Sequence, residues 1–457
     1  MPTGAEAFGG DTTNTNPGRD PRDRLGSLGL MGKHADLYER HVKVLPGWAP
    51  LYYEQPISIV DGDGRHVVDA EGNSYLDFFG GILVTMTGYR VPEVVDAIKR
   101  QADRMLHTST LYLIESQIEL AEKVAELSGI PDAKVFFTNS GTEANDAALM
   151  LATTYRNSNQ ILAIRGSYHG KSYSTIAITG QKAWSGTSLS PFQVTFIHGG
   201  YKLRSPFGHL SDDDFIAACV ADLEDMLRVA SAGEPAAMIA EPIQGVGGFV
   251  TPPDGFFGAM KEVLDAHGIL FISDEVQTGW GRTGEHFWGY QAHGITPDLL
   301  TFAKGLGNGL SIGGVVAPAE IMESYPAFGI TTFGGNPLAT AGALANLEVL
   351  LDQDLQTNAL KVGNRLMQNL IPLSEELELI GEVRGKGLMI GVELVGPGGE
   401  PAPEKAAAAL EAAREEGLLI GKGGIFGNSL RIAPALSITE EEADEGFARL
   451  ERALRRI

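Results

Sequence analysis

Seven short apolar runs, separated by stretches with helical spacing, constrain the fold of this chain more than any other feature. They all lie between residues 135 and 316. Short apolar runs that alternate with helical segments are the sequence form of βα units around a parallel sheet. The runs are 135–137, 161–164, 194–197, 237–240, 270–273, 300–303 and 314–316. The pattern predicts a large α/β domain with a mostly parallel, doubly wound sheet of seven strands flanked by helices.

The two ends of the chain carry a different pattern. Residues 57–60 and 66–68 flank an Asp-Gly-Asp-Gly sequence, which is typical of two antiparallel strands joined by a turn. After residue 340 a helical pattern extends to about Leu370, and we expect this helix to end before Pro372 because proline interrupts helix interiors. An alanine- and glutamate-rich helix and short apolar runs follow. We expect both ends to pack together as a small α+β domain.

These patterns divide the chain into four segments. The first residues are rich in Gly, Pro, Asp, Thr and Asn, which predicts a mobile tail. The predicted segments are a flexible tail at 1–28, the first part of the small domain at 29–90, the large domain at 91–345 and the second part of the small domain at 346–457.

Composition argues against several classes of protein. A net charge of -23 without a block rich in lysine and arginine argues against nucleic acid as a partner. No apolar stretch approaches the roughly 20 residues that span a bilayer, and the N-terminus lacks the pattern of a signal peptide. Cys219 is the single cysteine, which fits a reducing compartment. We therefore expect a soluble cytoplasmic protein without a membrane partner and without a metal.

Lys304 and Asp274 are the first candidates for chemistry. Asp274 and Glu275 follow one apolar run, and Lys304 follows the next. Open α/β sheets bind ligands outside the carboxyl ends of their strands. A carboxylate and an amine at that edge suit pyridoxal phosphate, because the amine forms a Schiff base and the carboxylate keeps the ring nitrogen protonated. The pattern alone does not separate Asp274 from Glu275, and each group could be an ordinary polar strand end.

Three further segments carry weaker signals. Ser140, Gly141 and Thr142 open a helical run and could bind a phosphate, although a serine cap occurs in many helices. Tyr168 could lay its ring over a planar ligand or serve as a packed structural residue. The hydroxyl-rich turn at Thr332 could add phosphate contacts or be a turn only.

In this order along the chain, the segments resemble the class III (ω-type) aminotransferases, which are fold-type I pyridoxal phosphate enzymes. The segments that carry the resemblance are 139–145, Tyr168-His169-Gly170, Asp274-Glu275-Val276-Gln277, Lys304 and 332–337. The resemblance extends from about residue 35 to the C-terminus and is greatest to the alanine–glyoxylate aminotransferase 2 branch. It implies the fold described above, with pyridoxal 5'-phosphate as the cofactor.

The resemblance also implies a role for each site residue. Lys304 would form the Schiff base, and Asp274 would pair with the ring nitrogen. Ser140, Gly141 and Thr142 would bind the phosphate, Tyr168 and Val276 would sandwich the ring, Gln277 would hydrogen-bond its phenolic oxygen, and Glu241 would be a further active-site acid. Thr332 would reach the phosphate of the neighbouring subunit in a homodimer, with a tetramer as the alternative. Arg431 would bind a substrate carboxylate.

The implied reaction is a ping-pong transamination through pyridoxamine phosphate, from an amino acid or an ω- or β-amino donor to a keto acid. Relatives that use 2-oxoglutarate usually carry a glutamate that masks the arginine, where this chain has Val246. Arg431 should then stay available, which favours pyruvate or glyoxylate as acceptor. A second departure, Tyr89 to Pro92 in place of the usual His-x-His-Pro, leaves the donor open. The alternatives are a 2-oxoglutarate-dependent ω-aminotransferase and an aminomutase or racemase of the same fold.

Overall fold

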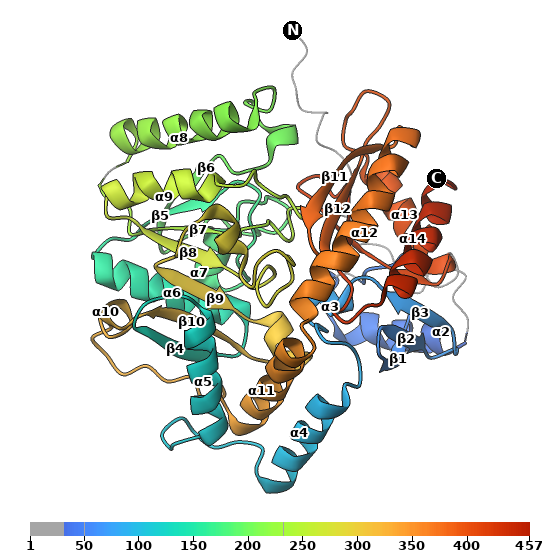
Figure 1. The fold of residues 1–457 in the computed structure, drawn as a ribbon, viewed down its shortest axis with the longest axis horizontal. Helices are drawn as coiled ribbons and strands as arrows, with labels where there is room; N and C mark the ends of the chain where they lie inside the picture. The colour runs from blue at the N-terminus through green and yellow to red at the C-terminus, as the bar shows by residue number, and fades with distance from the viewer. Residues whose placement is uncertain (1–31, 50, 232) are drawn as a thin grey trace.

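The large sheet contains the seven predicted strands. The structure, a computed structural model, describes residues 32–457 except 50 and 232, so the predicted tail at 1–28 lies outside the described residues. The sheet order is β4-β10-β9-β8-β7-β5-β6 (Figure 1), and β10 alone runs antiparallel to its neighbours. The strands are β4 (Ala133–Thr138), β5 (Gln160–Ile164), β6 (Gln193–Ile197), β7 (Ala237–Ala240), β8 (Leu270–Asp274), β9 (Leu299–Phe302) and β10 (Gly313–Pro318). The predicted mostly parallel sheet is confirmed.

Helices cover both faces of this sheet, which explains why its strands read as continuous apolar runs. Along β5, Ile161 packs into one core cluster with α6 (Gly141–Arg156), whereas its neighbour Leu162 packs into another with α8 (Asp212–Val229) and α9 (Phe256–Ala266). Successive side chains of a strand point to opposite faces. Both faces are therefore buried, and polar groups are confined to the strand ends.

Both ends of the chain build the small α+β domain, as predicted. One four-stranded sheet joins β1 (Ile59–Asp63), β2 (His66–Asp69) and β3 (Ser74–Asp77) to β13 (Leu418–Leu419), which pairs with β3 in parallel. A second contains β11 (Ile380–Lys386), β12 (Met389–Leu394), β15 (Ser429–Ile432) and β14 (Gly421–Gly423). The helices α2 (Gly32–Val44), α13 (Pro403–Glu415) and α14 (Glu440–Leu454) lie beside these sheets in Figure 1.

The prediction of one helix that ends near Leu370 is wrong. The segment forms α11 (Pro337–Asp352) and α12 (Leu355–Glu376), separated at Asp354, whose φ of 47° is left-handed. Helix α12 continues through Pro372, which lies on its exposed face, while Leu370 and Leu373 on either side are buried. Burial of this apolar stripe outweighs the lost backbone hydrogen bond. The boundary predicted after residue 345 falls inside α11.

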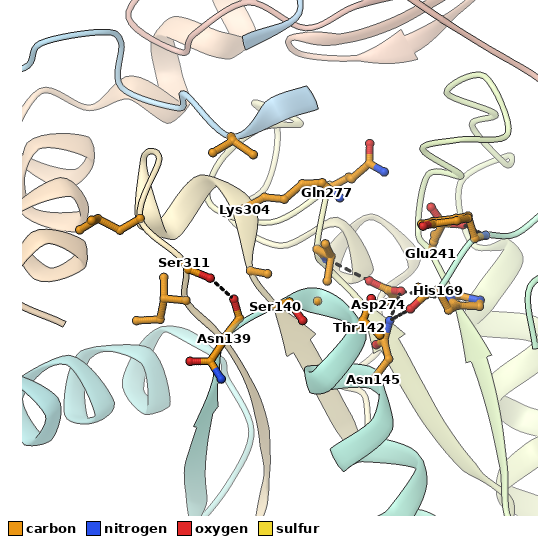
Figure 2. A pocket seen from close by; sticks show the side chains of 18 of the residues that line it. Asn139, Ser140, Thr142, Asn145, His169, Glu241, Asp274, Gln277, Lys304 and Ser311 are labelled. Atoms are coloured by element: carbon orange, nitrogen blue, oxygen red, sulfur yellow. Dashed lines mark hydrogen bonds and ion pairs between the residues drawn. The ribbon is translucent and has the colours of Figure 1, made fainter. Parts of the chain in front are cut away.

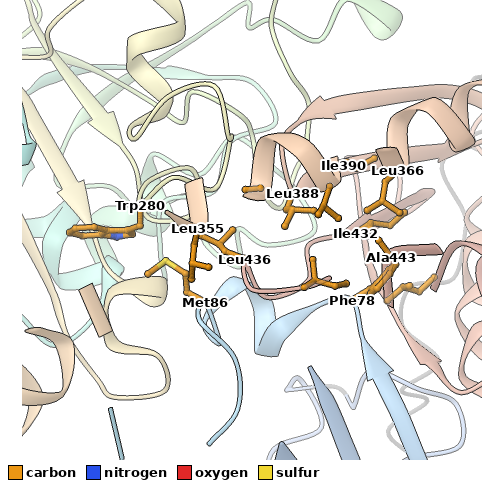
Figure 3. Close-up of a cluster of buried hydrophobic side chains, with 14 of the residues drawn as sticks. Phe78, Met86, Trp280, Leu355, Leu366, Leu388, Ile390, Ile432, Leu436 and Ala443 are labelled. Carbon is orange, nitrogen blue, oxygen red and sulfur yellow. The ribbon is translucent and has the colours of Figure 1, made fainter. Parts of the chain in front are cut away.

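One large hydrophobic cluster joins the two parts of the molecule. It contains Trp280 and Met86 together with Leu388, Ile432 and Leu436 from the C-terminal segment (Figure 3). The helices α4 (Pro92–Arg104) and α5 (Glu115–Leu127) pack against α11. Because the β15 segment is buried against large-domain side chains, it is held at a fixed place relative to the large sheet. None of the described helices is long and apolar enough to cross a membrane.

Candidate active site

A cavity of about 410 Å³ lies at the carboxyl edge of the large sheet (Figure 2). Six parallel strands end at this edge, and the predicted residues follow the ends of five of them, β4, β5, β7, β8 and β9. The cavity is lined by nine of the predicted site residues, namely Ser140, Gly141, Thr142, Tyr168, Glu241, Asp274, Val276, Gln277 and Lys304. Its volume is sufficient for a small-molecule ligand of drug-like size.

Lys304 sits at the start of the 3-10 helix η3 (Lys304–Gly307), directly after β9. Its φ of 44° lies in the left-handed region, which is uncommon for a residue with a side chain and is concentrated at functional sites. Within the described residues its ammonium group has no hydrogen bond and no ion pair. Burial lowers the pKa of Lys304 to about 8, although Asp274 and Glu241 oppose this shift. A useful fraction of the amine is therefore neutral and nucleophilic near neutral pH.

The structure separates the two adjacent acids. Asp274 ends β8 and lines the cavity, where its Oδ1 accepts a hydrogen bond of 3.1 Å from the Val276 N–H. Glu275 points away from the cavity and accepts hydrogen bonds from Ser273, Thr278, Gly289 and Tyr290, at 2.5 to 3.1 Å. Burial raises the pKa of Glu275. Asp274 is thus the acid available to a ligand, and Glu275 holds the following loop in place.

Two residues without a predicted role, His169 and Asn145, support the Asp274 carboxylate. Its Oδ2 lies 2.7 Å from Nδ1 of His169 and accepts a 2.8 Å hydrogen bond from Nδ2 of Asn145. Asn145 also donates to the His169 carbonyl and accepts from Thr301. Figure 2 shows Asp274, His169 and Asn145 together beside the cavity. Both lie in the motifs that carry the resemblance, but nothing in those motifs indicated that they contact Asp274.

The turn where β4 leads into α6 has the features of an anion site. Ser140 caps this helix by accepting from the Glu143 N–H at 3.2 Å, and Gly141 and Thr142 occupy its first turn, where backbone N–H groups lack partners within the helix. A Cβ on Gly141 would lie 2.9 Å from the Val276 side chain, so glycine is required for this close approach. The helix N-terminus and the hydroxyls of Ser140 and Thr142 suit a phosphate.

Tyr168 and Glu241 are joined across the cavity wall. The Tyr168 N–H donates to Glu241 at 2.9 Å, and its ring contacts Trp184 edge-on at 5.3 Å between centroids. Glu241 also accepts from the Gly245 N–H at 2.7 Å, and burial raises its pKa to about 7. Nearby, Oε1 of Gln277 is buried without a hydrogen-bond partner among the described residues. Such an orphaned polar group at a cavity wall is a candidate ligand contact.

Arg431 and Thr332 do not line this cavity. Arg431 is buried on β15 and donates to the carbonyls of Lys422 and Gly245, and its guanidinium lies 4.8 Å from the Phe79 ring centroid. No carboxylate of the described residues forms an ion pair with it. Its charge acts on Lys304, whose pKa it lowers. Thr332 is exposed, next to Phe333, which is 61% exposed.

A left-handed turn, α3 (Gly80–Leu83), leads into one wall of the cavity. Ile82 and Leu83 have φ values of 67° and 59°, which are costly for residues with bulky side chains. Asp77 holds the turn by accepting from the Phe79 and Gly80 N–H groups, and Leu83 is buried. Val84, the next residue, lines the cavity. No sequence pattern indicated this turn.

The residues fit the cofactor expected from the sequence. The N-terminus of α6 and its hydroxyls could bind the phosphate of the cofactor. The hydrogen-bonded Asp274 carboxylate could contact the ring nitrogen, and the Lys304 amine could bond to the aldehyde carbon. Oε1 of Gln277 and Nε2 of His169 are both buried without hydrogen-bond partners in the part of the chain that the structure describes, so this pocket has unused polar groups.

Comparison with known proteins gives a consistent result. The family model described as aminotransferase class-III matches residues 49–454. The chain is 42% identical to alanine–glyoxylate aminotransferase 2 homolog 2, mitochondrial, of Arabidopsis thaliana, over 86% of this chain and 81% of that protein. It is 39% identical to a leucine/methionine racemase of Thermococcus litoralis, over 92% of this chain and 95% of that protein. An amine transaminase from an uncultivated Pseudomonas species, solved in its PLP-bound form, superposes with a TM-score of 0.84 at 31% identity, over 88% of this chain and 95% of that one.

Proposed function

The chain belongs to the class-III aminotransferases, and from this premise we propose how its residues bind the cofactor and choose the keto acid. The protein is an enzyme that transfers an amino group from a donor to a keto acid, and its cofactor is pyridoxal phosphate. When bound, this cofactor supplies a ring that accepts the electrons released when the substrate α carbon loses its proton.

In our proposal Lys304 anchors the cofactor and then moves protons. Its Nζ is the only amine on the cavity lining in the described part of the chain, and with a pKa near 8 it can both take and return a proton at the substrate α carbon. Asp274, fixed by His169 and Asn145, holds the proton on the ring nitrogen. Ser140, Gly141 and Thr142 bind the phosphate, while Tyr168 and Val276 enclose the ring and Gln277 donates to it.

We propose that the acceptor is a small keto acid such as pyruvate or glyoxylate. The observation that carries this proposal is Arg431, a buried guanidinium held by two backbone carbonyls with no acid beside it among the described residues. Val246 is buried where a masking glutamate would stand. An uncompensated buried cation attracts a carboxylate, and guanidinium binds it in bidentate geometry. The printed name of the Arabidopsis relative, an alanine–glyoxylate aminotransferase, supports this choice.

An acceptor screen tests the proposal. The purified enzyme with one amino donor is assayed against pyruvate, glyoxylate and 2-oxoglutarate, and kcat/KM is measured for each. We expect both small keto acids to exceed 2-oxoglutarate, and the reverse order would contradict the proposal. Because two relatives are named as racemases, the enzyme is also incubated with a single L-amino acid and no acceptor. Catalytic racemisation without an acceptor would favour that second function instead.

We also propose a homodimer in which Thr332 binds the phosphate of the neighbouring subunit. Thr332 is exposed and lies outside its own cavity, and Phe328 and Phe333 beside it expose apolar side chains, as interface residues do. A cytoplasmic location is part of the proposal and is supported by the single, buried cysteine. The Arabidopsis and human relatives carry mitochondrial names, so fractionation of the source cells is the test.

A further inference from the structure

Arg282 is a buried cation that the chemistry above does not use. It is 2% exposed and lies in the loop after β8, eight residues beyond Asp274. In the described part of the chain no carboxylate lies within ion-pair distance of it. Burial lowers its pKa to about 9, so it still carries its charge at neutral pH. A buried charge without a counter-ion is costly, so its backbone partners must offset that cost.

Those partners all belong to the segment that carries Arg431. Arg282 donates through Nη1 to the carbonyl of Leu388 at 3.2 Å and to the carbonyl of Pro434. In return the Leu388 N–H donates to the Arg282 carbonyl at 3.1 Å. Leu388 lies between β11 and β12, and Pro434 lies two residues beyond the end of β15. Because β12 and β15 are antiparallel, with Ile390 opposite Ile432, Leu388 and Pro434 lie at the same end of the pair. Arg282 therefore ties one large-domain loop to the C-terminal end of the strand that holds Arg431 and to the adjoining start of β12.

The surrounding contacts make this link short and stiff. A Cβ on Gly387 would lie 2.5 Å from the backbone of Thr283, so the β11–β12 turn touches the Arg282 loop without an intervening side chain. Leu388 and Leu436 are fully buried in the cluster of Figure 3. In β12, Gly391 is in register with Arg431. The same loop carries Val276 and Gln277 on the cavity wall, so Arg282 connects this wall to the segment that holds Arg431.

We infer that Arg282 is a positioning residue that sets the distance between the carboxylate-binding Arg431 and the reactive Lys304. The inference rests on the proposed role of Arg431. Without the guanidinium, β15 would keep its strand partners but lose its tie to the Asp274 loop. Arg431 would then bind a carboxylate less well, because a small displacement of a group that orients the substrate lowers its affinity. Chemistry at Lys304, which begins η3 after β9, would be preserved.

The test uses the holoenzyme in steady state, with L-alanine as the varied amino donor and glyoxylate as the acceptor at a fixed concentration, and measures the pyruvate that is formed. We expect Arg282→Met to raise the apparent KM for alanine and the inhibition constant of propionate about tenfold, with kcat changed less than about twofold. Gln356→Ala is the matched control. Gln356 donates to Gly284 of the same loop from α12, without reaching β15, and this variant should change neither constant. Arg282→Lys, which keeps the charge, serves if the methionine variant is unstable, and should weaken alanine binding by a smaller factor.

A double-mutant cycle with Arg431→Leu separates positioning from general damage. If Arg282 acts through Arg431, adding Arg282→Met to Arg431→Leu should weaken alanine and propionate binding no further. An equal loss in both backgrounds, or a loss in kcat alone, would overturn the inference. Arg431→Leu without any effect on alanine or propionate would instead refute the proposed role of Arg431 itself.

Discussion

Asp274 and His169 form a buried pair in which Oδ2 of the carboxylate lies 2.7 Å from Nδ1 of the imidazole, although the residues are 105 apart in sequence. Asn145 bonds to the same oxygen. Two partners on one oxygen fix the carboxylate, while Nε2 of His169 is buried without a hydrogen-bond partner among the described residues. Asp274 is thus positioned before any ligand binds.

The first prediction contrasts Asp274 with its neighbour. Asp274→Asn should lower kcat at least about 100-fold, because it removes the charge that holds the ring proton. Glu275→Gln should instead lower the melting temperature and leave kcat nearly unchanged, since Glu275 accepts four structural hydrogen bonds outside the cavity. Steady-state kinetics and thermal unfolding of both variants check the contrast. Equal loss of kcat in the two variants would mean that the acids have been assigned wrongly.

Lys304 should attach the cofactor with an unusual pH dependence. Its pKa of about 8, lowered by burial, means that the neutral amine becomes the major form above pH 8, rather than above the ordinary value of 10.5. The rate at which the cofactor-free protein forms its covalent link should therefore rise with a midpoint near pH 8, as followed by absorbance. Borohydride should trap the cofactor on Lys304. Lys182→Ala, at an exposed lysine, should leave trapping intact, whereas trapping in Lys304→Ala would refute the role of Lys304.

Val246→Glu should weaken the use of pyruvate as the acceptor. A carboxylate here would lie next to Gly245, whose carbonyl accepts from Arg431 at 3.3 Å, and could pair with the guanidinium. A hydrogen-bonded charge contributes about 1.5 to 3 kcal/mol, so kcat/KM for pyruvate should fall roughly tenfold or more. Val246→Gln has the same length without the charge and is the control. If glutamine lowers kcat/KM as much as glutamate, the effect is steric rather than electrostatic.

Glu241 should make stability depend on pH. Burial raises its folded pKa from 4.5 to about 7, so between these values the unfolded state is ionised while the folded state is not. This contribution to stability is present below pH 4.5 and is lost as pH rises through 7. As pH rises from 5 to 8, the free energy of unfolding of Glu241→Gln should therefore increase relative to that of the wild type by on the order of 2 kcal/mol. Urea unfolding of the two cofactor-free proteins measures this difference. The exposed Glu224→Gln should show no such trend.

The sequence predicted the large sheet because its strands are buried on both faces and read as apolar runs, and it predicted the site because polar residues follow those strands. The residue pattern alone could not separate Asp274 from Glu275, and only the family resemblance favoured Asp274, since the choice depends on which way each side chain points after β8. The contact between His169 and Asp274 could not be predicted for the same reason. The prediction that the helix ends before Pro372 failed because tertiary burial of Leu370 and Leu373 outweighs the local effect of proline. The turn at Ile82 arises from contacts with Asp77 and a buried cluster, which no local pattern encodes.

The shared active site gives the last prediction. If Thr332 binds the phosphate of the partner subunit, Thr332→Glu should abolish activity by repelling that phosphate, and Lys304→Ala should abolish it by removing the amine. Each homodimer is then inactive. In a mixed dimer, one site combines the intact Lys304 of the first subunit with the intact Thr332 of the second, so co-refolding the two variants should restore a fraction of the wild-type activity. If Thr332 served its own subunit, every site would keep one defect and mixing would restore nothing. Activity of the mixture, measured against each variant refolded alone, therefore distinguishes a site shared between subunits from one built within a single chain.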